Sequence, residues 1–332
     1  MTSKDAPEFE ISSVGELIDL VEQTGEIIDY VYRGQSSKYE FLTTSLERYA
    51  LTDREVEDLE QLNPGTSFQD PISRRGFLCN AEGRLLKTYK ERAHNHLGNL
   101  PSPKDHLGWL ALMQHHGAPT RLLDVTRSIF VALYFATLHN DNSDGIVYSI
   151  YDSDWFYMCA GKQAQPEYIT KLFNPDGPNA TERANRVLRL ELPRSTYRSD
   201  DPKAVPGILR VRPRQLSKRQ IAQQGEFLMP MTVVQSFEEN LEALFDLSAS
   251  DYLLTDEQVK AFEKDKQLYP YKAMTPDPVM QPIVKFRIPR KHFRTIRITL
   301  MQMNITTESL FPDFDGFTKS MHELVQRTKD FY

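Results

Sequence analysis

The chain has 332 residues, of which 40% are hydrophobic and 26% charged, a composition typical of a globular protein with one large domain or two modest ones. Its two cysteines, Cys79 and Cys159, lie far apart and argue against a disulfide framework or a structural zinc site. A net charge of −6 argues against bulk electrostatic attraction to nucleic acid or to an anionic membrane.

The N-terminal sequence MTSKDAPEFE is polar and acidic, which is unlike a signal peptide. No apolar run approaches the roughly 20 residues that a membrane-spanning helix requires. We therefore expect a cytoplasmic protein with no membrane partner.

The first part of the chain alternates predicted helices with a strand. Apolar spacing predicts an amphipathic helix over residues 11–24, a strand over 27–33, and helices over 85–97 and 105–116, with a partly irregular insertion near 52–80. Gly117 and Pro119 are typical of the residues that follow a helix C-terminus.

The second part is richer in predicted strands. Strands are predicted over 122–126, 146–151, 187–192, 207–211, 227–234 and 284–288, and helices over 128–138, 293–303 and 318–329. An acidic helix after residue 236 leads into a Pro-rich stretch, predicted as an insertion near 236–280. The sequence predicts an α+β fold: a single mixed domain over 1–332 with a central, mainly antiparallel sheet flanked by peripheral helices.

The tetrapeptide Tyr32-Arg33-Gly34-Gln35 at a predicted strand end is the first candidate site. The guanidinium of Arg33 offers a planar fork of donors that matches phosphate or carboxylate oxygens. Gly34 lets a ligand or another backbone approach closely. The alternative is an exposed arginine at the end of a strand.

The run from Gln114 to Ala136, QHHGAPTRLLDVTRSIFVALYFA, is the second candidate and the predicted centre of the site. Asp124, Thr126 and Ser128 alternate along a predicted strand, so we expect their side chains to share one face and form a ligand floor. The alternative is that these residues cap helices, with Ser128 as the N-cap of the following helix, and that the histidines are packed. The candidate ligand-binding residues are Gln35, His115, His116, Thr120, Arg121, Asp124, Thr126 and Ser128.

The segment from Arg219 to Phe227, before a predicted strand, is the third candidate. Glu226 is a candidate charge stabiliser or general base, with Gln224 as its orienting partner. The alternative is a surface turn. The sequence has no P-loop, GxGxxG, GxSxG or HExxH motif, and we expect no metal.

These motifs together resemble the FRG domain family, named for its Phe/Tyr-Arg-Gly motif, over nearly the whole chain. Tyr32 to Gln35 is similar to the signature, and the run from Gln114 to Ala136 is similar to the most characteristic block of the family. The segments 41–48, 219–227 and 305–316 resemble further family elements in the same order. The resemblance implies no settled reaction.

A weaker likeness to ADP-ribosyltransferases follows from the layout of the motifs. In that fold an early strand supplies an arginine or a histidine, a second strand carries a Ser/Thr-x-Ser pattern before an Ala-rich helix, and a late strand offers Glu or Gln. Arg33, then Thr126-x-Ser128, then Gln224 to Glu226 occur in that order. This likeness implies Arg33, Gln224 and Glu226 as catalytic residues.

Two hypotheses remain open. The first is an NAD-consuming enzyme, an ADP-ribosyltransferase or NAD glycohydrolase, in the setting of a bacterial or phage toxin or a defence effector, with NAD as substrate and the protein or nucleic-acid acceptor left open. Thr126 and Ser128 would support Arg33, and His116 or Tyr134 would contact the nicotinamide, with a place in the core as the alternative for Tyr134. The second is a non-catalytic module that binds an anionic ligand or partner. In it, Arg33, Arg121 and Asp124 form a buried ion network, and a basic edge from Lys285 to Arg297 engages the partner.

Overall fold

A seven-stranded sheet forms the centre of the computed structural model, which describes residue 3 and residues 6–23, 30–39, 41–62, 71–138, 142–151, 180–191, 206–214, 216–245 and 283–329. The strands are β1 (Glu8–Glu10), β2 (Tyr30–Ser36), β3 (Leu123–Thr126), β4 (Gly145–Tyr151), β5 (Ile208–Val211), β6 (Gly225–Pro230) and β7 (Ile283–Ile288). Their order is β1-β7-β4-β2-β3-β6-β5, with β1 parallel to β7 and every other pair antiparallel. The predicted α+β class with a mainly antiparallel sheet is confirmed.

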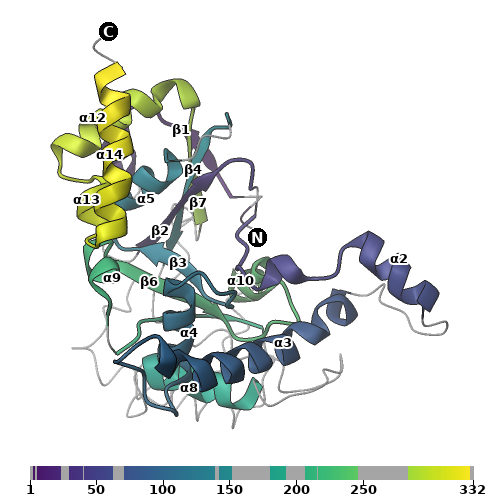
Figure 1. Ribbon diagram of the computed structural model, residues 1–332. Helices are drawn as coiled ribbons and strands as arrows, with labels where there is room; N and C mark the ends of the chain where they lie inside the picture. Colours follow the sequence, from purple (N-terminus) through teal and green to yellow (C-terminus); the bar gives the residue numbers. More distant parts are fainter. Residues whose placement is uncertain are drawn as a thin grey trace, which may run out of the picture.

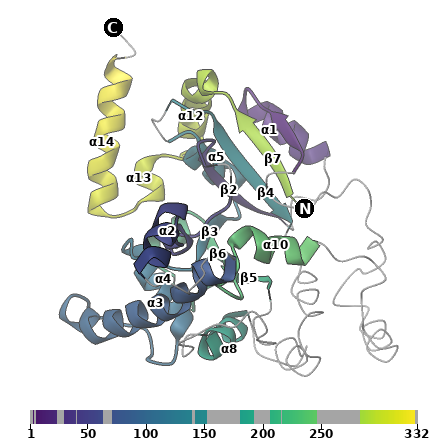
Figure 2. The same ribbon diagram turned by 90° about the vertical axis from the view of Figure 1, so that its right-hand side faces the viewer.

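Helices lie on both faces of this sheet (Figures 1 and 2). In the described residues they are α1 (Val14–Gln23), α2 (Asp53–Leu62), α3 (Pro71–Arg92), α4 (His106–His115), α5 (Ile129–Ala136), α8 (Ala180–Glu191), α9 (Lys218–Ala222), α10 (Phe237–Phe245), α12 (Phe293–Gln302), α13 (Thr307–Leu310) and α14 (Phe314–Lys329). Figure 1 shows α5 and α12 near β2, β4 and β7, and α3, α4 and α8 near β3 and β6.

Two apolar cores follow from this arrangement. One joins α1, α5 and α12 to β4 and β7, with members such as Leu17, Ala132 and Phe286. The other joins α4, α8 and α10 to β3, β5 and β6, with members such as Leu110 and Val187. The cores lie on opposite faces of the sheet, because neighbouring residues of β4 belong to different cores: Val147 to the first, and Ile146 and Tyr148 to the second.

Strands β2 and β3 meet at only one register pair, Tyr32 with Thr126. In contrast, β2 pairs with β4 over seven positions and β3 pairs with β6 over four. Beyond Tyr32 the two strands therefore diverge, and the sheet splits at its centre. This split positions the candidate site.

Gly34 explains how α5 can lie directly on β2. A Cβ atom at this position would lie 1.7 Å from the carbonyl oxygen of Ala132 and 2.7 Å from the backbone nitrogen of Ala136. A Cβ at Gly145 on β4 would lie 2.4 Å from the carbonyl oxygen of Ala136. The glycines of the two strands and the alanines of α5 thus allow backbone-to-backbone contact.

We expect Gly34→Ala to lower the free energy of unfolding by about 1–3 kcal/mol, because α5 must shift to admit the methyl group. Gly76→Ala in α3 is the matched control, since a Cβ added there would have no other atom within 4 Å. That change should be neutral or slightly stabilising. Thermal melts give the melting temperatures of both variants. Equal melting temperatures would contradict the packing argument.

The capping residues confirm two predicted helix starts. Asp105 accepts a hydrogen bond from the backbone nitrogen of Gly108 as N-cap of α4. Ser128 accepts one from the backbone nitrogen of Val131 at 3.4 Å as N-cap of α5. The capping interpretation of Ser128 is therefore correct.

Several element predictions are wrong. The range 187–192 is predicted as a strand, but 180–191 forms helix α8, whose Ala184, Val187 and Leu188 are buried at helical spacing. Within 52–80 the described residues form α2 and the start of α3, and the other residues of this predicted insertion lie outside the described part of the chain. Strand β1 is not predicted, α14 begins at Phe314 rather than near residue 318, and most of the 236–280 insertion lies outside the described residues.

The predicted basic edge is partly neutralised by β1 and the turn before β4. The ammonium group of Lys285 lies 3.4 Å from a carboxylate oxygen of Glu8. The guanidinium of Arg287 pairs with Glu8 and lies 3.7 Å from the carboxylate of Asp144. This edge is therefore less cationic than its sequence indicates.

Candidate functional site

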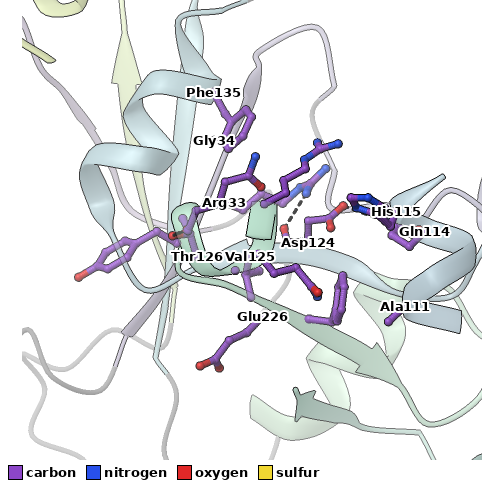
Figure 3. A pocket seen from close by; sticks show the side chains of 16 residues that line it. Arg33, Gly34, Ala111, Gln114, His115, Asp124, Val125, Thr126, Phe135 and Glu226 are labelled. Atoms are coloured by element: carbon purple, nitrogen blue, oxygen red, sulfur yellow. Dashed lines mark hydrogen bonds between the residues drawn. The ribbon is translucent and has the colours of Figure 1, made fainter. Parts of the chain in front are cut away.

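A cavity of about 230 Å³ opens where β2 and β3 diverge (Figure 3). Residues from β2, β3, β6, α4, α5 and α9 line it: Tyr32, Arg33, Gly34, Ala111, Gln114, His115, Asp124, Val125, Thr126, Phe135, Arg219, Gln220, Gln223, Gly225, Glu226 and Phe227. All three candidate segments contribute to this lining, although they are far apart in the chain.

Arg33 lies at the split of the sheet. Its Nη1 donates a hydrogen bond to the backbone carbonyl of Asp124 at 2.7 Å. This bond crosses the gap between β2 and β3, where the two strands no longer pair. The Nε–H of Arg33 is donated to Oε1 of Gln35 at 3.1 Å. These bonds use two of the five N–H donors of a guanidinium, so three remain without a partner among the described residues. Burial lowers the pKa of Arg33, which the charge of Asp124 opposes.

A chain of hydrogen bonds orients the carboxylate of Asp124. Gln114 on α4 donates from Nε2 to Oδ2 of Asp124 at 2.8 Å. The hydroxyl of Thr120 donates to Oε1 of Gln114 at 2.6 Å, and the backbone nitrogen of Thr120 donates to the hydroxyl of Ser45 at 3.0 Å. Asp124 thus presents an exposed but held carboxylate beside Arg33. Thr120 itself is buried and contributes through Gln114.

Thr126 and Ser128 close the turn between β3 and α5. The hydroxyl of Thr126 donates to the backbone carbonyl of Gln223 at 2.7 Å and accepts from the backbone nitrogen of Ser128 at 3.0 Å. Thr126 lines the cavity, whereas Ser128 caps α5. The expectation that both residues support Arg33 is not met, because the guanidinium of Arg33 donates to Gln35 and Asp124 instead.

The turn before β6 carries the third candidate. Gln224 adopts φ = 47°, in the left-handed region that non-glycine residues rarely enter, and its carbonyl accepts from the backbone nitrogen of Arg127 at 3.1 Å. Gln224 is exposed and outside the cavity lining, while Gln223 lines the cavity. The place predicted for the side chain of Gln224 is therefore occupied by its neighbour.

Glu226 is buried between two arginines. Its carboxylate oxygens lie 3.5 Å from Nε of Arg127 and 3.4 Å from Nε of Arg210, and 10% of the side chain is exposed. Figure 3 shows Glu226 extending to the side away from Arg33 and Asp124. The structure therefore brings Glu226 into the cavity lining but not its carboxylate to the guanidinium of Arg33.

His115 and His116 end α4 with their rings 4.9 Å apart between centroids. His115 lines the cavity, and its pKa is lowered by burial and by the charges of His116 and Arg219, against the opposing charge of Asp313. His116 is exposed and outside the lining. His115 is thus the histidine available to a ligand, as a neutral imidazole at neutral pH.

Arg121 and Tyr134 belong to the core instead. Arg121 is completely buried and donates from Nε to both carboxylate oxygens of Glu82, at 3.0 and 2.9 Å. The predicted ion network of Arg33, Arg121 and Asp124 is therefore wrong. Tyr134 is buried with its hydroxyl 2.6 Å from that of Thr307.

The C-terminal segment packs against three residues of the cavity lining, Arg219, Phe135 and Gln223. The guanidinium carbon of Arg219 lies 4.5 Å above the ring of Phe311, and that ring contacts Phe135 edge-on at 6.1 Å. Gln223 donates from Nε2 to the carbonyl of Leu310 at 3.1 Å. Sequence reasoning does not single out Arg219 and Phe135 as site residues, and their proximity depends on this C-terminal segment.

The fold and site define an α+β protein with a polar cavity at a split in its sheet. The family model of the FRG domain matches residues 28–145, which include β2, β3 and α5. The chain therefore contains an FRG domain, as the resemblance implied. The segment with Glu226 lies beyond the matched residues.

No curated protein and no solved structure gives a significant match to the chain. Within the described ranges, no helix is long and apolar enough to cross a membrane. The same residues contain no group of three or more His, Cys, Asp or Glu side chains placed to hold a metal ion.

Proposed function

We propose that this protein is a cytoplasmic NAD-consuming enzyme, an ADP-ribosyltransferase or NAD glycohydrolase, with its active site at the split of the sheet. The observation that carries the proposal is the guanidinium of Arg33, which faces the cavity with three N–H donors still available. Donors in this fixed geometry suit the paired oxygens of a diphosphate or the hydroxyls of a ribose.

The strand order supports the proposal. The likeness to ADP-ribosyltransferases implies that an arginine, a Thr-x-Ser pattern and a Glu or Gln act together on one substrate, although they are far apart in sequence. Arg33, Thr126 and Glu226 lie on β2, β3 and β6, which are successive neighbours in the sheet. Adjacent strands are what such joint action requires.

In the proposed reaction, the bond between the ribose C1′ and the nicotinamide nitrogen breaks, and its electron pair leaves with neutral nicotinamide. The sugar passes through an oxocarbenium-like state before water, or an acceptor group, bonds to C1′ and releases a proton. With water the products are ADP-ribose, nicotinamide and H⁺. The site must hold the nucleotide, favour positive charge at the sugar and receive a proton.

Two carboxylates, those of Asp124 and Glu226, are candidates to stabilise the positive charge that develops at the sugar. Asp124 is exposed in the cavity beside Arg33, and Gln114 holds its carboxylate at 2.8 Å. Glu226 is nearly buried, and its negative charge is balanced by Arg127 and Arg210. Of the two, Asp124 has the placement that favours a developing cation and a proton transfer.

The test is release of nicotinamide from NAD by purified protein, separated by chromatography. We expect release by the wild-type protein and a loss of about 100-fold or more in Asp124→Asn, because removal of one electrostatic stabiliser has an effect of this size. Glu226→Gln should have the smaller effect. If Glu226→Gln abolishes release and Asp124→Asn does not, the assignment of the two carboxylates is reversed. Absence of release by folded wild-type protein with every acceptor tested would argue against the enzyme.

A non-catalytic binding module is the second candidate. The pairing of Glu226 with two arginines favours it, because a carboxylate engaged in this way is typical of a structural role. In this case calorimetry would detect binding of an anionic ligand at Arg33 with no turnover. Binding of NAD without nicotinamide release would favour this alternative.

A further inference from the structure

A second cavity, of about 760 Å³, adjoins the first. The two cavities share Ala111, His115 and Gln220 in their linings, so they are neighbouring chambers that meet at α4 and α9. Its other walls come from the loop before α4, from α8 and from the segment before α9. We call this second cavity the arginine groove.

Positive side chains dominate the arginine groove. Its lining contains Lys104, Arg186, Arg189 and Arg214 as cations, and Asp105 and Glu182 as carboxylates. Both carboxylates are engaged within the protein. Asp105 caps α4 and accepts from Nδ2 of Asn185 at 2.9 Å, and Glu182 pairs with Arg214 at 3.1 Å.

The positive charges of this region also affect the pKa of a neighbouring histidine, His106. Burial and the charges of Lys90 and Arg189 lower the pKa of His106 to about 4, although Asp105 opposes the shift. Burial is the largest cause of this shift, and the two cations add to it because they disfavour a third positive charge nearby.

Gln220 points to a ligand where the two cavities meet. Its Oε1 accepts from the backbone nitrogen of Ser217 at 3.0 Å in a capping box, which places the donor group, Nε2, on the other side of the amide. Nε2 is buried and has no hydrogen-bond partner among the described residues. A buried donor without an acceptor is unfavourable, and a small turn of the side chain toward the junction of the cavities would let a ligand oxygen satisfy it.

Size indicates that a ligand extends from one cavity into the other. The first cavity, at about 230 Å³, is smaller than the roughly 300–1,000 Å³ typical of small-molecule sites. The lining of the arginine groove contains no Phe, Tyr or Trp on which a base could stack. Its chemistry therefore fits phosphate groups better than bases.

We propose that the arginine groove binds the phosphate groups of a nucleotide that reaches into the first cavity, with Arg186 and Arg189 as the principal cations and Gln220 as a donor between the two chambers. The proposal deepens the proposed function, since the phosphates belong either to NAD itself or to a phosphate-bearing nucleic-acid acceptor. The groove is a binding site in both cases.

Direct binding tests this without any turnover. The probe is ADP, titrated into the full-length protein in a calorimeter at low salt, with adenosine as the uncharged comparison. The test variant is Arg186→Gln/Arg189→Gln, whose two side chains are exposed, so the fold should be retained. The control is Lys291→Gln/Arg294→Gln, which removes the same charge from exposed residues of α12 and of the 3-10 turn before it.

We expect ADP to bind wild-type and control protein and to lose about 10-fold or more in affinity for the test variant, because only the test variant removes charge-assisted hydrogen bonds at the groove. Adenosine should bind weakly and equally to all three. No ADP binding, or equal losses in test and control variants, would overturn the proposal. This result does not depend on nicotinamide release, so failure of the enzyme proposal is seen separately.

Two further titrations distinguish the source of the phosphates. If NAD loses affinity for the test variant in parallel with ADP, the groove holds the diphosphate half of NAD. If the affinity for NAD is unchanged while a short 5′-phosphorylated oligonucleotide loses affinity, the groove holds the acceptor. Unchanged affinity for both ligands would contradict the proposal, whatever ADP does.

Discussion

Replacing Arg33 by alanine should lower nicotinamide release by about 100-fold or more while the melting temperature stays close to that of the wild type. The half-buried guanidinium donates to Gln35 and to the carbonyl of Asp124, and no carboxylate forms a buried ion pair with it in the described residues. Its loss therefore leaves no uncompensated charge in the core, but it removes three donors from the cavity. Chromatography of the reaction and thermal melts of the same preparations measure both quantities.

Arg33→Lys is the informative control. Lysine keeps the positive charge but is a point charge without the planar fork, so it cannot both bridge the split and bind paired oxygens. We expect most of the activity to be lost in this variant as well. Full activity in Arg33→Lys would mean that only charge matters. Unfolding of Arg33→Ala would instead favour a structural role for the motif arginine.

Removing either partner of the Arg121–Glu82 pair should, unlike the Arg33 change, destabilise the fold, lowering the free energy of unfolding by about 3–5 kcal/mol. Both side chains have 0% exposure. Arg121 donates from Nε to each carboxylate oxygen of Glu82. Arg121→Ala or Glu82→Gln leaves the remaining charge buried without its counterion. Urea unfolding measured by circular dichroism gives the change in free energy.

The double variant Arg121→Met/Glu82→Leu distinguishes the effect of the ion pair from the effect of side-chain packing at the same positions. Because replacing a buried pair by apolar residues of similar volume is often neutral, the double variant should be more stable than either single variant. A double variant that is destabilised by the sum of the two single changes would show that the residues act independently. Nicotinamide release by any folded variant should be retained, since neither residue lines the cavity.

The elements around the site could be predicted because local signals agree there. Asp105 and Ser128 are capping residues directly before apolar helices, and both helices start where the caps indicate. The range 187–192 is misleading because Val187, Leu188 and Leu190 also fit a strand pattern when the residues before 187 are ignored. Strand β1 is three residues long, too short for a periodic signal, and depends on its pairing with β7.

The candidate site could be predicted at the level of segments but not of contacts. All three candidate segments meet at one cavity, and Arg33, Asp124 and Thr126 line it. The partner of Arg121 could not be predicted, because Glu82 is contributed by a distant helix. The role of Gln114 escapes prediction for a related reason, since only the packing of α4 beside β3 brings its amide to Asp124.

The single register pair between β2 and β3 makes the two halves of the sheet dependent on what fills the gap. A ligand held by Arg33 on one strand and by Asp124 on the other would brace the halves, so its binding energy would also oppose unfolding. For one site at 100 times Kd this linkage amounts to about 2.7 kcal/mol. A compound that bridges the split should therefore raise the melting temperature of the protein. A thermal-shift screen would detect such a ligand without any knowledge of the reaction.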